Sequence, residues 1–323
     1  MSETPSSNRK VALPVVVLGF PRSGTTLLSK LLDKHPEISS PPETNMLAAC
    51  GRFLRETDGE GPPLGVLSGL ALSGIEEDVI LDELRRMVFS IQTRLANGKP
   101  VWMEKSAFDI FYLDEIERLL AGHCRFVCPV RNPLDVIVSV RELVDKAGHH
   151  MVELRDYIVR YDSPYLAYAQ AWIDCAAALE RFVARHKEHC LIYRYEDLVE
   201  RPEETLAKLT SFIGVSPPAA DLVASSFSQG GRIGLGDWKI YERKAIDQQS
   251  IGRWRQSLPK SIAAKIIPQL APYLTAYGYP VPNVPRVPGR MDKVRQFELA
   301  KRMQMSAKAQ SESQSEPQLK QKT

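Results

Sequence analysis

The sequence lacks the features of several protein classes. Only five of its 323 residues are cysteine, and no Cys-x-x-Cys pair occurs, which argues against a zinc site or a disulfide framework. The net charge is only +3, far from the basic stripe of a nucleic-acid-binding protein. No apolar run is long enough to span a membrane, and the polar start "MSETPSSNRK" has no signal-peptide pattern. We therefore expect a cytoplasmic protein without a nucleic-acid partner.

A further absence lies in the stretch "VVVLGFPRSGTTLLSKLLDKHP", residues 15–36. Its order of apolar strand, glycine turn and leucine-spaced helix is typical of a phosphate-binding loop. A nucleoside-triphosphatase carries a lysine in this loop, but here the sequence reads Gly24-Thr25-Thr26. Triphosphate hydrolysis is therefore disfavoured. The N–H groups at the helix start and the permanent cation of Arg22 still favour an anion.

A second apolar strand, "RFVCPV", ends at Arg131. A P-loop enzyme has a magnesium-binding aspartate at the end of such a strand. An arginine at this position predicts a second anion site in place of a metal ligand. Two phosphate-binding sites without a metal carboxylate suit a nucleotide that carries phosphates on its 5′ and 3′ sides, so we expect no metal.

Apolar strands alternate with amphipathic helices along the chain. This alternation predicts a P-loop-like, three-layer α/β/α fold around a central, mainly parallel sheet. The region 51–74, rich in glycine and proline, is predicted to be an irregular loop. The expected strands are 15–19, 38–40, 101–105, 125–130 and 190–193, and the expected helices are 25–34, 75–97, 109–120, 133–144, 162–186 and 203–213.

The ends of the chain differ in composition from its middle. Residues 1–12 are polar and predict a flexible tail, and residues 13–285 are predicted to form one domain. Residues 286–323 form a C-terminal tail, and from about residue 304 they are rich in Gln, Ser and Lys. Because such a segment cannot bury enough apolar surface to fold, we expect it to be largely disordered.

Three motifs occur in one order: "FPRSGTTLL", "RFVCPVRNPLDVIVSV" and "GGRIGLGDWK". In this order they resemble the sulfotransferases that use 3′-phosphoadenosine 5′-phosphosulfate (PAPS), and the resemblance extends from about residue 15 to residue 279. It implies that the first motif holds the 5′-phosphosulfate and that Arg131 and Ser139 hold the 3′-phosphate. The residues of the first motif that would contact the nucleotide are Arg22, Ser23, Gly24, Thr25 and Thr26.

Further segments resemble the tyrosylprotein sulfotransferases and their bacterial relatives. "HPEISSPPET" and "WMEKSAF" are similar to the segments that carry the catalytic glutamate and lysine of those enzymes, which places these roles on Glu43 and Lys105. "LIYRYEDLVERPEETL" is similar to a segment that places a tyrosine, here Tyr195, near the nucleotide.

The chain departs from the cytosolic family members at one point. Their Arg-Lys-Gly is replaced here by Gly231-Arg232-Ile233. The 3′-phosphate is therefore expected to contact either Arg232 alone or Arg243 and Lys244.

The resemblance implies transfer of a sulfuryl group from PAPS to a hydroxyl, or an amine, of a small-molecule, lipid or carbohydrate acceptor. Glu43 would act as general base, and Arg22 and Lys105 would stabilise the developing charge. Residues 50–100 and 144–170 are expected to shape the acceptor pocket. Two alternatives stay open: a P-loop-type kinase or NTPase, and a catalytically inactive nucleotide-binding protein. A homodimer is also left open.

Overall fold

The computed structural model describes residues 13–56, 65–228, 245–284 and 290–315. Two compact units are distinguished: residues 1–258 with 269–281, and residues 259–268 with 282–323. The first unit contains the whole sheet and the candidate site. The second unit includes α15 (Arg290–Ser315), whose described side chains are exposed.

The sheet has five parallel strands in the order β2-β3-β1-β4-β5. The central strand is β1, in which Val17 lies beside Lys105 of β3 and Val127 of β4. All parallel strands end at one edge, so the segments that follow them meet there. The strands are β1 (Val15–Val17), β2 (Ile38–Ser39), β3 (Val101–Lys105), β4 (Arg125–Val130) and β5 (Cys190–Arg194).

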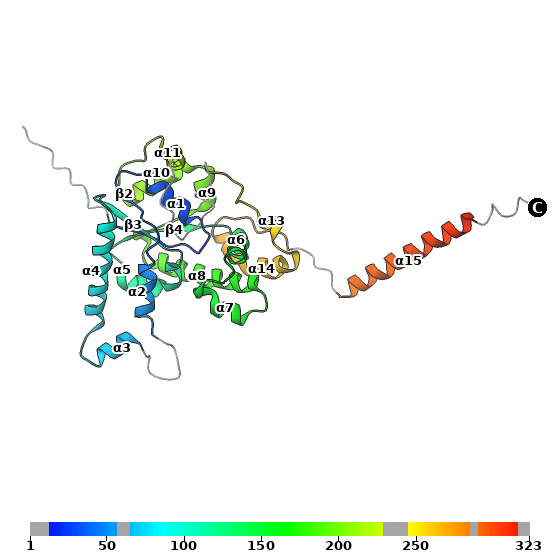
Figure 1. Cartoon of the computed structure of the whole chain (residues 1–323), viewed down its shortest axis with the longest axis horizontal. Helices are drawn as coiled ribbons and strands as arrows, with labels where there is room; N and C mark the ends of the chain where they lie inside the picture. The colour runs from blue at the N-terminus through cyan, green and yellow to red at the C-terminus, as the bar shows by residue number, and fades with distance from the viewer. Residues whose placement is uncertain (1–12, 57–64, 229–244, 285–289, 316–323) are drawn as a thin grey trace, which may run out of the picture. The chain divides into compact units, whose positions relative to one another are not determined.

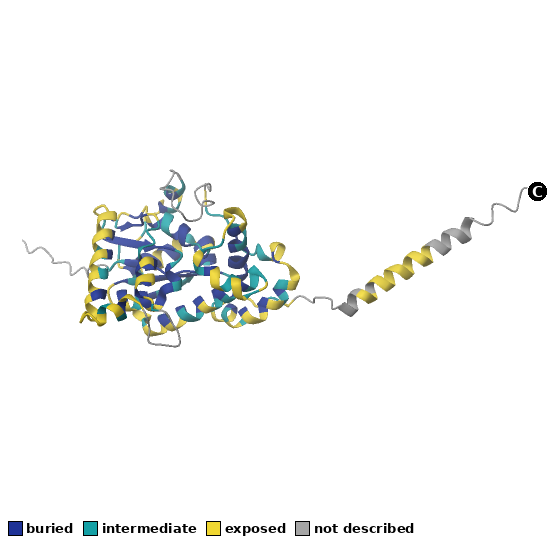
Figure 2. Cartoon of the chain, turned by 60° about the horizontal axis from the view of Figure 1, so that its bottom comes forward, coloured by how far each residue is buried: buried dark blue, intermediate teal, exposed yellow. Residues whose placement is uncertain are grey.

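Helices cover both faces of the sheet (Figures 1 and 2). Side chains alternate along β4. Val127 joins the core under α1, whereas the Phe126 ring packs on the Phe182 ring of α8 at 4.8 Å. Both faces are thus apolar, as in a parallel sheet buried on both sides. One face carries α1 (Thr25–Leu32), α9 (Tyr195–Glu200), α10 (Pro202–Ile213) and α11 (Leu222–Ser228), and the other carries α5 (Leu113–Leu120), α6 (Pro133–Ala147) and α8 (Pro164–Arg185).

The fold class predicted from the sequence is confirmed, but two local predictions were wrong. The region 51–74 is not uniformly irregular, because α2 continues to Leu54 and a short helix covers Val66–Ala71. Burial of one face of α2 stabilises a helix that local composition does not favour. The remaining helices are α2 (Met46–Leu54), α3 (Val66–Ala71), α4 (Glu77–Leu95), α7 (Arg155–Arg160), α13 (Trp254–Ser257) and α14 (Lys260–Ala276).

The second deviation lies at residues 109–120. They do not form one helix: a 3-10 turn, η1 (Asp109–Tyr112), precedes α5. Residues 304–315 continue α15, and the prediction that the tail is largely disordered from about residue 304 stays a prediction. Ala, Gln, Lys, Met and Glu favour a helix by local propensity.

Candidate active site

The predicted site residues gather at the carboxyl edge of the sheet. The loop of residues 18–24 follows β1, and Arg131 follows β4 directly. Lys105 is the last residue of β3, and Tyr195 is the first residue after β5. Glu43 lies in the segment after β2. These groups lie far apart along the chain, and the parallel topology brings them to one edge.

The loop after β1 has two residues with positive φ, Arg22 at 74° and Gly24 at 90°. A non-glycine residue in this region is strained, and such strain is concentrated at functional sites. Gly24 is required for a second reason, since a Cβ atom here would lie 2.2 Å from the Tyr195 ring. The turn delivers the chain into α1, whose first N–H groups have no acceptor within the helix.

The loop arginine joins the two phosphate motifs. Arg22 Nε donates to Ser139 Oγ at 3.0 Å, across 117 residues of sequence. One terminal N–H of Arg131 donates to the carbonyl of Arg22 at 2.8 Å, and the other donates to the carbonyl of Ser250 at 2.7 Å. The Arg131 guanidinium also stacks over the Tyr195 ring at 4.7 Å. The predicted residues therefore form one contiguous cluster.

Ser250 belongs to this cluster but was missed from the sequence. Its hydroxyl is 2.7 Å from the Tyr195 hydroxyl, and both groups are buried. The stretch "SIGRW" carries no local pattern that marks its serine. The predicted contacts Arg232, Arg243 and Lys244 lie outside the described residues, as does the segment "GGRIGLGDWK".

The two predicted catalytic residues are in direct contact. Lys105 Nζ donates to Glu43 Oε1 at 2.6 Å, and the two side chains are only 4% and 6% exposed. Removal of both charges from water is costly, so a buried pair of this kind is weak evidence for stability alone. A buried carboxylate that is hydrogen-bonded to an ammonium group can hold and move a proton.

Comparison with known proteins identifies the family. The profile described as "Sulfotransferase family" matches residues 14–218, which is more than half of the chain. The chain belongs to the sulfotransferase family. This confirms the resemblance on which the site residues were assigned.

Curated relatives of this sulfotransferase support the assignment. The nodulation protein NoeE of Sinorhizobium fredii is 29% identical over 268 residues, which cover 76% of this chain and 61% of that protein. The match therefore spans less than two thirds of that relative. Protein-tyrosine sulfotransferase 1 of Danio rerio is 25% identical, with 87% of this chain and 76% of that protein covered.

Solved structures support the fold. The sulfotransferase domain from the Synechococcus PCC 7002 olefin synthase matches with a TM-score of 0.58 and 22% identity, covering 87% of this chain and all of that domain. The sulfotransferase domain from the curacin biosynthetic pathway matches with a TM-score of 0.56 and 21% identity, covering 85% of this chain and all of that domain. These likenesses confirm a sulfotransferase α/β/α fold.

Next to the Glu43–Lys105 pair, the fold buries two further carboxylates that the sequence did not identify. Glu104 accepts hydrogen bonds from the Thr44 hydroxyl at 2.9 Å and from the Gln92 side-chain amide. Burial raises the pKa of Glu104 to about 7, although those two hydrogen bonds oppose the shift. Burial, together with the charge of Glu104, raises the pKa of Asp109 well above its usual value.

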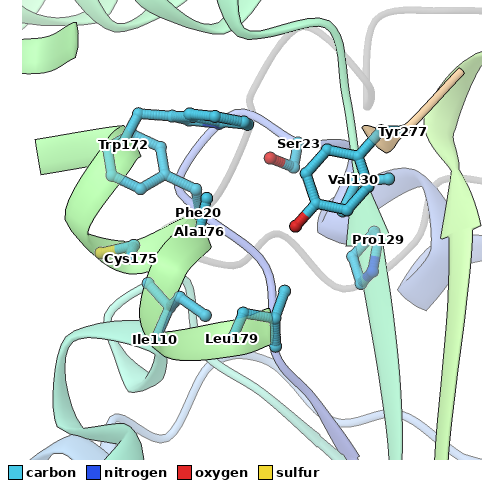
Figure 3. A pocket seen from close by; sticks show the side chains of 10 residues that line it. All are labelled: Phe20, Ser23, Ile110, Pro129, Val130, Trp172, Cys175, Ala176, Leu179 and Tyr277. Atoms are coloured by element: carbon cyan, nitrogen blue, oxygen red, sulfur yellow. The ribbon is translucent and has the colours of Figure 1, made fainter. Parts of the chain in front are cut away.

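An apolar pocket lies behind the phosphate loop (Figure 3). It encloses about 280 Å³, part of it open to solvent. The hydroxyls of Ser23 and Tyr277 point into it, and the Tyr277 ring packs edge-on against Trp172 at 6.4 Å. None of its residues belongs to 50–100 or 144–170, the regions predicted to shape the acceptor site. The lining residues are Phe20, Ser23, Ile110, Pro129, Val130, Trp172, Cys175, Ala176, Leu179 and Tyr277.

No helix in the described part of the chain is long and apolar enough to cross a membrane. Within the same residues, no three His, Cys, Asp or Glu side chains come together as a metal site would require.

Proposed function

We propose that this protein transfers a sulfuryl group from PAPS to a hydroxyl, or an amine, of a small-molecule, lipid or carbohydrate acceptor. The hydrogen bond from Arg22 to Ser139 carries this proposal. It joins the loop expected to hold the 5′-phosphosulfate to the helix expected to hold the 3′-phosphate. A triphosphate has no phosphate on its 3′ side and would leave the second position without use.

The donor groups around Arg22 and Arg131 suit a bound anion. Arg131 is buried, and its Nε has no hydrogen-bond partner among the residues that the structure describes. Such an orphaned donor is costly unless an acceptor reaches it. The neighbouring groups are the Arg22 guanidinium, the Ser139 hydroxyl and the N–H groups at the start of α1, all of which suit a phosphate. Arg22, Ser23, Gly24, Thr25 and Thr26, with Arg131, Ser139 and Tyr195, would hold the nucleotide.

PAPS supplies the sulfuryl group, and 3′,5′-ADP is the product that leaves. Arg22 and the loop N–H groups stabilise charge on the transferring group, as donors do in phosphoryl transfer. Glu43 takes the proton from the acceptor, a role typically worth about 10²–10⁴-fold in rate. Lys105 holds Glu43 in place and offers its N–H donors to the bridging oxygen as charge develops there.

Nucleotide binding tests the donor assignment. Isothermal titration calorimetry with 3′,5′-ADP should show binding that does not require Mg²⁺. Tight, magnesium-dependent binding of ATP without any response to 3′,5′-ADP would favour the kinase or NTPase alternative.

Incubation with PAPS and a metabolite extract of the host tests the reaction. Mass spectrometry should detect a metabolite that gains one SO₃ only in the presence of the protein. Nucleotide binding without any such product, and without release of 3′,5′-ADP, would favour the catalytically inactive alternative.

A cytoplasmic location is also part of this proposal. All five cysteines are buried free thiols, which a reducing compartment preserves. Fractionation of the host should recover the protein with cytoplasmic markers, and recovery with membranes or in the medium would contradict this location.

A further inference from the structure

Side-chain contacts hold the segment after β2 against the end of β3. Three consecutive residues, 43–45, each contact one of three consecutive residues, 104–106. These contacts hold the segment although it forms no strand of its own. The contacts are Lys105 Nζ to Glu43 Oε1 at 2.6 Å, the Thr44 hydroxyl to Glu104 Oε1 at 2.9 Å, and the Ser106 hydroxyl to Asn45 Oδ1 at 2.8 Å.

Glu104 makes one of these three contacts and a further one to α4. Its carboxylate is buried and accepts from Thr44 on one side and from Gln92 of α4 on the other. An ionised carboxylate is acceptor-only, so it satisfies both donors at once. Glu104 therefore connects α4, through Thr44, to the segment that carries Glu43.

The charges around Glu104 are few and buried. Lys105 of β3 and Asp109 of η1 interact electrostatically with Glu104, and Glu43 of the segment after β2 interacts with Asp109 and pairs with Lys105. Cys50 of α2 faces Asp109, and burial raises the pKa of its thiol to about 11, so it stays neutral. Three carboxyl groups thus share one cation. Burial, together with the charge of Glu104, raises the pKa of Asp109 well above its usual value.

We propose that Glu104 is a positioning residue for Glu43: its carboxylate anchors Thr44 and so holds the neighbouring Glu43 against Lys105. The inference rests on the proposed function, because it gives Glu43 the role of base. The ionisation of Glu104 adds a negative charge next to Thr44 and Lys105, the two neighbours of Glu43. Turnover should therefore rise with pH as Glu104 ionises, since an ionised carboxylate is the stronger acceptor for the Thr44 hydroxyl and so holds Glu43 more firmly.

Substitution of Thr44 tests the anchor. Thr44→Val removes the hydroxyl but keeps the shape, and should lower the release of 3′,5′-ADP from PAPS about 10-fold, since small displacements of reacting groups cost up to about 100-fold. Binding of 3′,5′-ADP should stay within about twofold of the wild type. Thr44→Ser should restore the rate. Thr210→Val, which removes a buried hydroxyl from α10, is the matched control and should have no effect.

Two results would overturn the anchor. One is a Thr44→Val variant as active as the wild type. The other is a loss of 3′,5′-ADP binding equal to the loss of rate, which would indicate general damage.

Substitution of Glu104 tests the charge. Glu104→Gln can keep both contacts of the native side chain. Its amide oxygen can accept from Thr44, and its amide N–H can donate to Oε1 of a rotated Gln92 side chain, an atom without a partner within the described residues. In Glu104→Gln the rise of the rate around pH 7 should disappear, whereas Glu115→Gln, at a buried carboxylate paired with Arg55, should retain it. Persistence of the rise in Glu104→Gln would contradict the role of Glu104.

A readout without activity separates this inference from the proposed function. In protein labelled with ¹³C at the glutamate carboxyls, the resonance lost in Glu43→Gln identifies Glu43. In the wild type its chemical shift should change around pH 7 as Glu104 ionises. This change should be absent in Glu104→Gln, and the line should broaden in Thr44→Val. If the wild type never releases 3′,5′-ADP from PAPS, the proposed function fails while these spectra still decide the coupling. An unchanged Glu43 signal in both variants would refute it.

Discussion

The two ends of the site are built from different chemistry. The end proposed to hold the nucleotide consists of the Arg22 and Arg131 guanidiniums, the Ser139 and Ser250 groups and an aromatic ring. The other end gathers three buried carboxyl groups around Lys105. Arginine stays charged at any physiological pH, so the first end should bind over a wide pH range. Burial raises the pKa values of Glu104 and Asp109, so the second end should respond to pH. Binding and chemistry are thus separable by substitution.

Loss of the base should produce the largest effect. Glu43→Gln should lower turnover by about 10²–10⁴-fold, because the amide cannot take the acceptor's proton. Binding of 3′,5′-ADP should be unchanged, and release of 3′,5′-ADP from PAPS together with calorimetry measures both. Glu115→Gln is the matched control. A Glu43→Gln variant that keeps its rate would place the base elsewhere.

The next largest effect should be the pH dependence of the free energy of unfolding. The pKa of Glu104 rises from 4.5 to about 7 on folding, so its contribution is fully favourable below pH 4.5 and is lost as the pH rises through 7. With about 1.4 kcal/mol per pKa unit, the loss approaches about 3 kcal/mol. Urea unfolding at pH 5 and pH 8 should show that Glu104→Gln loses less stability than the wild type. Equal losses in both proteins would mean that Glu104 does not titrate in this range.

Substitution of Arg131 should have an intermediate effect, and this effect should be on the binding of 3′,5′-ADP. Arg131→Lys cannot make both carbonyl hydrogen bonds and stack on Tyr195. The dissociation constant of 3′,5′-ADP should rise by about 10- to 100-fold, which corresponds to loss of one or two charged hydrogen bonds. Arg125→Lys, at the opposite end of the same strand, should bind normally. Equal binding by Arg131→Lys and the wild type would remove Arg131 from the nucleotide site.

The smallest expected effect concerns the link between the two phosphate motifs. Ser139→Ala removes the acceptor of Arg22 Nε and should weaken 3′,5′-ADP binding about fivefold, or about 1 kcal/mol. Calorimetry measures this, with Ser226→Ala, a buried helical serine of α11, as control. A weaker rate with unchanged binding would assign Ser139 to the chemistry rather than to the nucleotide.

Much of the fold could be predicted because its signals are local. The continuous apolar run Val15–Val17, the glycine turn and the leucine spacing of α1 follow one another closely along the chain. The proline at the start of α6 and Gly214 after α10, with φ of 82°, mark helix ends in the expected way. The short helix α3 was missed because nearby glycines and prolines suggest a loop, and its few turns depend on packing.

The candidate site also combines residues that the sequence identified with residues that it did not. The residues Arg22, Glu43, Lys105 and Arg131 were identified by motif, each at or just past the end of a strand. Glu104 and Asp109 were not, because in the sequence an acid next to Lys105 or at a helix start reads as ordinary surface. Both carboxyl groups are buried in the folded chain. This burial results from the packing of α2, α4 and η1, which the local sequence does not show.

By itself, the sequence determined the alternation of strands and helices, the phosphate loop without its lysine, and the residue types at each strand end. These depend on neighbours along the chain. The tertiary structure decided that Arg22 meets Ser139 across 117 residues and that Glu43 meets Lys105 across 62. It also decided that two acids lie buried behind that pair. Hydrogen bonding and desolvation act between groups close in space, so their partners and the pKa values they set follow only from the folded chain.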